Sequence, residues 1–215
     1  MMIRYYSTNR DVKTIAGIIP FAGSVSFKEA LLAGQAPDEG LFMPDTIPSL
    51  AMSDIIALRE KPYWQAAQLV AGAFLSGEFS YSVLEEIVKD AYNYPVPLEA
   101  VYPRAFILRL DQGPTASFKD FAARMMARLM SHSRPEGERI NILVATSGDT
   151  GSAVGEAFKG VAGIDVTILY PAAEVSAMQK KQLDTIGDNV QAVSVDGKFD
   201  DCQNLVKEAF SDPEL

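Results

Sequence analysis

The chain has 215 residues, 48% of them apolar and 22% charged, which is ordinary for a globular protein with one sizeable core or two smaller ones. A formal net charge of −9 repels nucleic acid and anionic membranes, so neither is an expected partner. The only cysteine, Cys202, excludes a disulfide framework within the chain, and the only histidine, His132, excludes a histidine-rich metal site. With neither a signal-like start nor an apolar run of bilayer-spanning length, we expect a cytoplasmic protein that holds no metal.

Residues 1–100 combine short helical patterns with turns rich in proline and glycine, and we predict that they form a small N-terminal domain. A helix is expected over 26–32, where Ser26 and Glu29 have the spacing of a capping box. Apolar residues at helical spacing predict two further helices, over 63–75 and 81–91.

Residues 101–215 alternate between predicted strands and predicted helices. The strands are expected over 105–110, 140–145, 166–170 and 190–195. The helices are expected over 118–130, 151–158, 175–186 and 200–210, with Cys202 as a buried structural thiol in the last. This alternation predicts an α/β domain with a parallel sheet, flanking helices and functional loops at the carboxyl ends of the strands.

The loop after the first predicted strand carries a lysine, Lys119, where the following helix begins. Gly113 and Pro114 predict a turn, and Thr115 or Ser117 is expected to cap the helix. The helix dipole is positive at this end, which favours the neutral amine that Schiff-base chemistry needs. Taken alone, the loop is a weak signal, and a solvated surface lysine is the favoured reading.

The loop after the strand at 140–145 has the sequence TSGDTGS over residues 146–152. Its glycines allow the backbone to approach a ligand, and hydroxyl groups and backbone amides converge at a helix N-terminus, which suits a carboxylate or a phosphate. Asp149 adds an acceptor for a phenolic hydroxyl. A plain strand-to-helix connection remains the alternative reading, and the loop lacks the patterns of a dinucleotide or ATP site.

Together the two loops resemble those of the threonine synthase family. The segments that carry the resemblance are YSTN at 6–9, VSFKEA at 25–30, APDEGLFMP at 36–44, GPTASFKDF at 113–121, ATSGDTG at 145–151 and VDGKFDDCQ at 195–203. They follow the family's order along nearly the whole chain. The resemblance therefore implies a tryptophan-synthase-β-like fold, fold type II of the pyridoxal-phosphate enzymes, with residues 101–215 as a partial cofactor-binding α/β domain.

The same resemblance implies a cofactor, a reaction and the residues that serve them. The cofactor would be pyridoxal 5'-phosphate, held by Lys119 as the catalytic lysine, with Asp149 bonded to its ring hydroxyl. The residues that would hold the substrate carboxylate or phosphate are Ser147, Gly148, Thr150 and Gly151. The implied reaction is the conversion of O-phospho-L-homoserine and water to L-threonine and phosphate, a carbon–oxygen lyase reaction of threonine biosynthesis.

Members of the resembled family are much longer, and their Gly-Asn-x-Gly loop for the cofactor phosphate has no counterpart in this sequence. We therefore expect a truncated chain, the N-terminal portion of a longer enzyme, that lacks part of its pocket and is inactive alone. Two alternatives stay open: another fold type II enzyme such as a serine or threonine dehydratase, or a non-catalytic interaction module. No oligomeric state is predicted.

Overall fold

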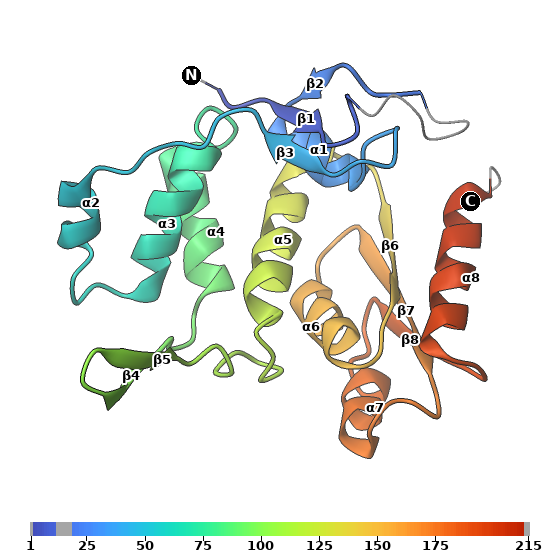
Figure 1. Ribbon diagram of the computed structural model, residues 1–215. Helices are drawn as coiled ribbons and strands as arrows, with labels where there is room; N and C mark the ends of the chain where they lie inside the picture. Colours follow the sequence, from blue (N-terminus) through green and yellow to red (C-terminus); the bar gives the residue numbers. More distant parts are fainter. Residues whose placement is uncertain (1, 12–18, 213–215) are drawn as a thin grey trace. The chain divides into compact units, whose positions relative to one another are not determined.

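The computed structural model describes residues 2–11 and 19–212, which divide into two compact units (Figure 1). The first unit is Met1–Asn93 and the second is Tyr94–Leu215. We describe each unit separately.

A small antiparallel sheet organises the beginning of the first unit. Its strands are β1 (Tyr5–Ser7), β2 (Ser24–Val25) and β3 (Phe42–Pro44), in the order β2-β1-β3. Side chains from this sheet and from the neighbouring helices form its core, with Ile3, Tyr5 and Ala30 at the centre and Phe27, Phe42 and Phe74 packed around them.

The helices of the first unit are α1 (Phe27–Ala33), α2 (Met52–Ala57), α3 (Tyr63–Phe74) and α4 (Tyr81–Ala91), which confirms the three predicted from the sequence. In α1 the predicted capping box is present, because Ser26 accepts from the amide of Glu29 and Glu29 accepts from the amide of Ser26. Helices α3 and α4 pack against each other, and α4 turns inward the apolar residues that recur at helical spacing.

A three-stranded parallel sheet organises the second unit, as the sequence predicts. Its strands are β6 (Ile140–Ala145), β7 (Ile164–Pro171) and β8 (Val190–Val195), in the order β6-β7-β8. The helices are α5 (Asp120–Ser133), α6 (Asp149–Phe158), α7 (Ala177–Asp184) and α8 (Phe199–Ser211). Helices α6 and α7 lie against one side of the sheet and α8 against the other, while α5 packs on α6 (Figure 1).

The core of the second unit lies mainly along one face of the central strand β7, where the alternating residues Ile164, Val166, Ile168 and Tyr170 are buried. Cys202 on α8 is also fully buried, which confirms its predicted structural role. Burial raises the pKa of its thiol, so the group stays protonated and unreactive near neutral pH.

The strand predicted over 105–110 exists, but its expected place in the parallel sheet is wrong. β5 (Ala105–Leu108) pairs antiparallel with β4 (Leu98–Tyr102), a strand that the sequence did not predict. The two-residue connection includes Arg104 at a φ of 66°, in the left-handed region that tight hairpin turns use. A short apolar run has the same pattern in a hairpin and in a buried parallel strand, so periodicity alone could not separate the two.

Over residues 2–11 and 19–212, no helix has both the length and the apolar character that crossing a membrane requires. The same residues contain no group of three or more His, Cys, Asp or Glu placed to hold a metal ion.

Candidate active site

Lys119 lies immediately before α5, at the N-cap position, with φ −66° and ψ −19°. The helix begins two residues later than predicted, and the expected side-chain cap from Thr115 or Ser117 is absent. Ser117 Oγ instead accepts from the amide of Lys119 at 3.3 Å. The lysine side chain is half-buried, and its Nζ lies 4.5 Å from the ring centroid of Phe118. The amine is therefore held against an aromatic ring and stays accessible to a ligand.

The buried carboxylate of Asp120 holds the loop that precedes Lys119. Asp120 is 1% exposed and accepts from the Thr115 amide at 2.9 Å and from the Thr115 hydroxyl at 2.7 Å. A Cβ at Gly113 would lie 2.4 Å from Asp120 Oδ2, so only glycine lets the turn close this tightly. The Thr115 hydroxyl is directed at the Asp120 carboxylate and makes no cap bond to the amides of α5.

Ala116, inside the same turn, has a φ of 57°, a left-handed conformation that costs free energy for a residue with a Cβ. The two hydrogen bonds from Thr115 to Asp120 close the turn that contains this strained residue. They provide the local stabilisation that keeps Lys119 in a defined position.

The second candidate loop follows β6 and leads into α6. Thr146, which is 1% exposed, places its Oγ1 as acceptor for the amides of Gly148 at 3.0 Å and Gly151 at 2.8 Å. Gly148 has a φ of 134°, which side chains rarely allow, and a Cβ there would overlap the side chain of Gln179 at 2.4 Å. The loop is thus shaped by one buried hydroxyl and by one glycine.

This arrangement decides which groups of the loop can reach a ligand. The amides of Gly148 and Gly151 already donate to Thr146. Within the described chain, the amides of Ser147, Asp149 and Thr150 have no hydrogen-bond acceptor, and the side chains of all three are exposed. These amides lie at the positive end of the α6 dipole, so they form a set of donors suited to an anion.

Asp149 is the exposed carboxylate of this loop, and Gln179 orients it. Gln179 Nε2 donates to Asp149 Oδ1 at 2.8 Å, while Gln179 Oε1 accepts from the amide of Ser176 at 2.9 Å. The glutamine therefore links the loop to the capped start of α7.

The topology of the second unit directs both loops to the same end of the sheet. Strand β6 runs parallel to β7, and α6 begins where β6 ends. Helix α5 leads back to the start of β6 and packs on α6, so α5 also begins toward the carboxyl edge (Figure 1). No hydrogen bond joins residues 113–120 to residues 146–151 in the part of the chain that the structure describes.

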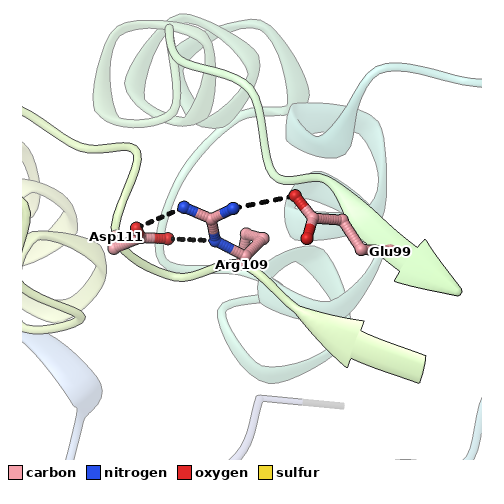
Figure 2. Close-up of polar contacts among 3 residues, drawn as sticks. All are labelled: Glu99, Arg109 and Asp111. Carbon is pink, nitrogen blue, oxygen red and sulfur yellow. Dashed lines mark hydrogen bonds and ion pairs between the residues drawn. The ribbon is translucent and has the colours of Figure 1, made fainter. Parts of the chain in front are cut away.

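An arginine ties the β4–β5 hairpin to the beginning of the Lys119 loop. Figure 2 shows Arg109 between two carboxylates: it donates to both oxygens of Asp111, at 2.8 and 2.6 Å, and to Glu99 on β4 at 2.8 Å. The bonds from Arg109 hold the pKa of the Asp111 carboxyl well below its usual range. The bidentate geometry fixes the direction in which the chain leaves β5.

The sequence singled out Lys119, Asp149 and their loops, but it missed three residues that shape these loops, Asp120, Thr146 and Gln179. Asp120 directly follows the lysine, and Thr146 directly follows a buried strand, so both stood beside the predicted site. The sequence feature that could have revealed both is a polar side chain near the start of a helix. The partner of Gln179 lies 30 residues away, and no local pattern reveals it.

Comparisons with known families agree with the two-unit division. Residues 4–92 match the family described as threonine synthase N terminus, and residues 96–215 match the family described as pyridoxal-phosphate dependent enzyme.

Individual relatives extend these matches. The threonine synthase of Haemophilus influenzae is 44% identical over 191 residues, which are 89% of this chain and 44% of that protein. The threonine synthase of Escherichia coli is 39% identical over the same coverage.

Solved structures give the same result for the fold. A structure of threonine synthase from Brucella melitensis with pyridoxal phosphate bound superposes with a TM-score of 0.88 at 40% identity, covering 99% of this chain and 45% of that chain. The yeast threonine synthase superposes with a TM-score of 0.83 at 32% identity. The chain thus spans a little under half the length of the relatives it matches. It belongs to the family of pyridoxal-phosphate dependent enzymes, and its two units correspond to the N-terminal portion of threonine synthases.

Proposed function

We propose that this chain forms the cofactor-anchoring part of a threonine synthase, with Lys119 as the lysine that carries pyridoxal phosphate. The observation that carries the proposal is the position of Lys119: an accessible amine where α5 begins, behind a turn fixed by buried Asp120. A lysine that carries a cofactor must be reachable and must point in a constant direction. Lys119 meets both requirements, and it lies in the segment that matches the pyridoxal-phosphate family.

The second loop suits the other polar groups of such a site. The exposed carboxylate of Asp149, oriented by Gln179, is an acceptor for the ring hydroxyl of the cofactor. The hydroxyls and amides of Ser147 and Thr150 supply donors for the substrate carboxylate or phosphate. Because the amides of Gly148 and Gly151 are engaged by Thr146, we assign these glycines to the shape of the loop and to the close approach of the ligand.

The chemistry then follows from these groups. When bound, pyridoxal phosphate supplies an electron sink that makes the protons on the substrate α and β carbons acidic. The Lys119 amine acts as the base and acid that moves those protons. The donors of the Ser147–Gly151 loop would hold the anionic end of O-phospho-L-homoserine while phosphate leaves from its γ carbon. The γ carbon would take up a proton to become the methyl group, and water would add at the β carbon to give threonine.

Three further assignments belong to the same proposal. We assign the functional division of the chain to residue 100, with residues 1–100 as the threonine-synthase-type N-terminal domain and 101–215 as the partial cofactor-binding domain. We propose a role in threonine biosynthesis. A cytoplasmic location fits the single, buried cysteine.

A hybrid enzyme tests the activity. This chain replaces the matching 44% of the Haemophilus influenzae threonine synthase, and the hybrid is supplied with O-phospho-L-homoserine and pyridoxal phosphate. We expect threonine and phosphate in equal amounts. Lys119→Ala should reduce the rate at least a thousand-fold, while Lys159→Ala, which removes an exposed lysine after α6, should leave it unchanged.

Two results would contradict the proposal. One is formation of 2-oxobutanoate from threonine without turnover of the phosphorylated substrate, which indicates a dehydratase. The other is a hybrid that keeps its activity after Lys119→Ala.

A further inference from the structure

Helix α7 begins with a capping box in which the third helical residue is a glutamine, Gln179. The hydroxyl of Ser176 accepts from the amide of Gln179 at 3.2 Å, and Gln179 Oε1 accepts from the amide of Ser176 at 2.9 Å. The oxygen end of the Gln179 side chain is therefore engaged at the start of α7, which holds the side chain in place.

The cap leaves the amide nitrogen of Gln179 for another acceptor, and that acceptor is Asp149. Gln179 Nε2 donates to Asp149 Oδ1 at 2.8 Å. The loop has space for this contact because residue 148 is a glycine: a Cβ at Gly148 would lie 2.4 Å from both Cδ and Nε2 of Gln179. The glutamine amide is thus held between the cap of α7 and the backbone of the loop before α6.

This contact gives the two oxygens of the Asp149 carboxylate different roles. Oδ1 accepts from Gln179, whereas Oδ2 accepts no hydrogen bond from any of the described residues. The terminal torsion of an aspartate has a broad range, so an exposed carboxylate without such a contact has no constant direction. With Oδ1 held by Gln179, Oδ2 becomes an acceptor of fixed direction.

The contact needs a glutamine at position 179, although the cap does not. A glutamate at the third helical position forms the same capping box, and α1 has one, with Ser26 and Glu29. At position 179, a glutamate would bring a second carboxylate to Asp149, and two like charges at hydrogen-bond distance repel each other. The amide at position 179 is therefore a property that serves the loop and not the helix.

We infer that Gln179 is a positioning residue for the cofactor, an inference that rests on the proposed function of Lys119 and Asp149. Gln179 fixes Oδ1 of Asp149 so that Oδ2 accepts the ring hydroxyl of pyridoxal phosphate, and the cap at Ser176 holds Gln179 in place. Gln179 acts through Asp149 and does not touch the ligand. The capping box of α7 thereby serves the site as well as the helix.

The first measurement uses the chain alone, without cofactor. Hydrogen exchange of the Gln179 side-chain amide is followed by NMR, and we expect it to be at least ten-fold slower in the parent than in Asp149→Ala. The side-chain amide of Gln35, which donates to the carbonyl of Glu39 at 2.8 Å, is the internal control and should exchange equally in both proteins. Equal exchange at Gln179 would overturn the inference.

The second measurement uses the hybrid enzyme and determines the dissociation constant of pyridoxal phosphate from the visible absorption of the bound cofactor. Gln179→Glu should raise this constant at least ten-fold. The chain with the same substitution should unfold at the urea concentration of the parent, because the cap is retained and the exposed Asp149 can turn toward solvent. Glu29→Gln makes the converse change in the capping box of α1 and should leave the dissociation constant unchanged.

A double variant separates positioning from a general effect on the loop. When Asp149→Asn is combined with Gln179→Glu, donor and acceptor exchange places: the amide nitrogen at position 149 donates to the carboxylate at position 179. The amide oxygen at position 149 remains for the ring hydroxyl. We expect this double variant to bind pyridoxal phosphate at least five-fold more tightly than Gln179→Glu alone.

The outcomes distinguish this inference from the proposed function. If the parent hybrid takes up the cofactor and Gln179→Glu binds it as tightly, the inference fails alone. It also fails alone if the double variant binds no better than Gln179→Glu. A parent hybrid that takes up no pyridoxal phosphate would contradict the proposed function, and the role of Gln179 with it.

Discussion

At the scale of single residues, Asp120 determines the geometry around the candidate lysine. Its carboxylate is buried, accepts two bonds from Thr115 and leaves no space for a side chain at Gly113. We regard it as a positioning residue, because it contacts the loop that holds Lys119.

Replacing Asp120 by alanine should leave the amide and the hydroxyl of Thr115 without acceptors. Since buried unpaired donors are costly, we expect the free energy of unfolding to fall by about 2–3 kcal/mol, measured by urea denaturation. Asp165→Ala is the matched control, because the Asp165 carboxylate is exposed and pairs with Arg139 at the surface. Its cost should be about 0–1 kcal/mol. Equal losses in the two variants would show that Asp120 has no special role.

Residue types alone identified the two candidate loops, because a lysine where a helix begins and a run of Ser, Gly, Asp and Thr after a buried strand each suit a definite chemistry. They did not identify which amides remain available. That depends on the χ1 rotamer of Thr146, which directs its hydroxyl at two glycine amides. A sequence gives the donors and acceptors but not their pairing.

At the scale of elements, Arg109 connects the hairpin to the Lys119 loop through two carboxylates. These ion pairs are exposed, so they orient the chain after β5 more than they add to the free energy of unfolding. Its electrostatic effect on Asp111 is nevertheless measurable.

The pKa of Asp111 should lie well below the ordinary value of about 3.9, because Arg109 donates two bonds to the ionised form. A lowered folded-state pKa means that the contribution is present above pH 4 and is lost as the pH falls through the folded value. Arg109→Gln should therefore raise the pKa of Asp111 toward about 3.9, as followed by NMR of its carboxyl carbon. Arg139→Gln, which removes a different ion pair, should leave it unchanged. An ordinary Asp111 titration in the parent protein would refute this account.

Long periodic patterns predicted their elements well. The parallel strands at 140–145 and 190–195 have the expected bounds, because runs rich in apolar residues between turns suit a sheet with helices on both faces. Helix starts were less accurate: α5 begins at Asp120 and α6 at Asp149, since each start depends on side-chain bonds in the preceding turn. The sequence did not predict β4, because the tight turn that ends it has an arginine at the left-handed position, where glycine, asparagine or aspartate is the usual indication of a hairpin.

At the scale of the whole molecule, the structure has two compact units, Met1–Asn93 and Tyr94–Leu215. Each matches a different family description, and together they correspond to under half of a threonine synthase. The candidate lysine and the candidate anion-binding loop both belong to the second unit. We therefore expect the second unit to determine cofactor attachment.

The most direct test of the central claim is to mix the protein with pyridoxal phosphate, reduce it with borohydride and identify the modified peptide by mass spectrometry. We predict that the trapped adduct lies on Lys119 and disappears in Lys119→Ala, while Lys159→Ala is trapped like the parent. An adduct on a different lysine, or undiminished trapping in Lys119→Ala, would contradict the assignment.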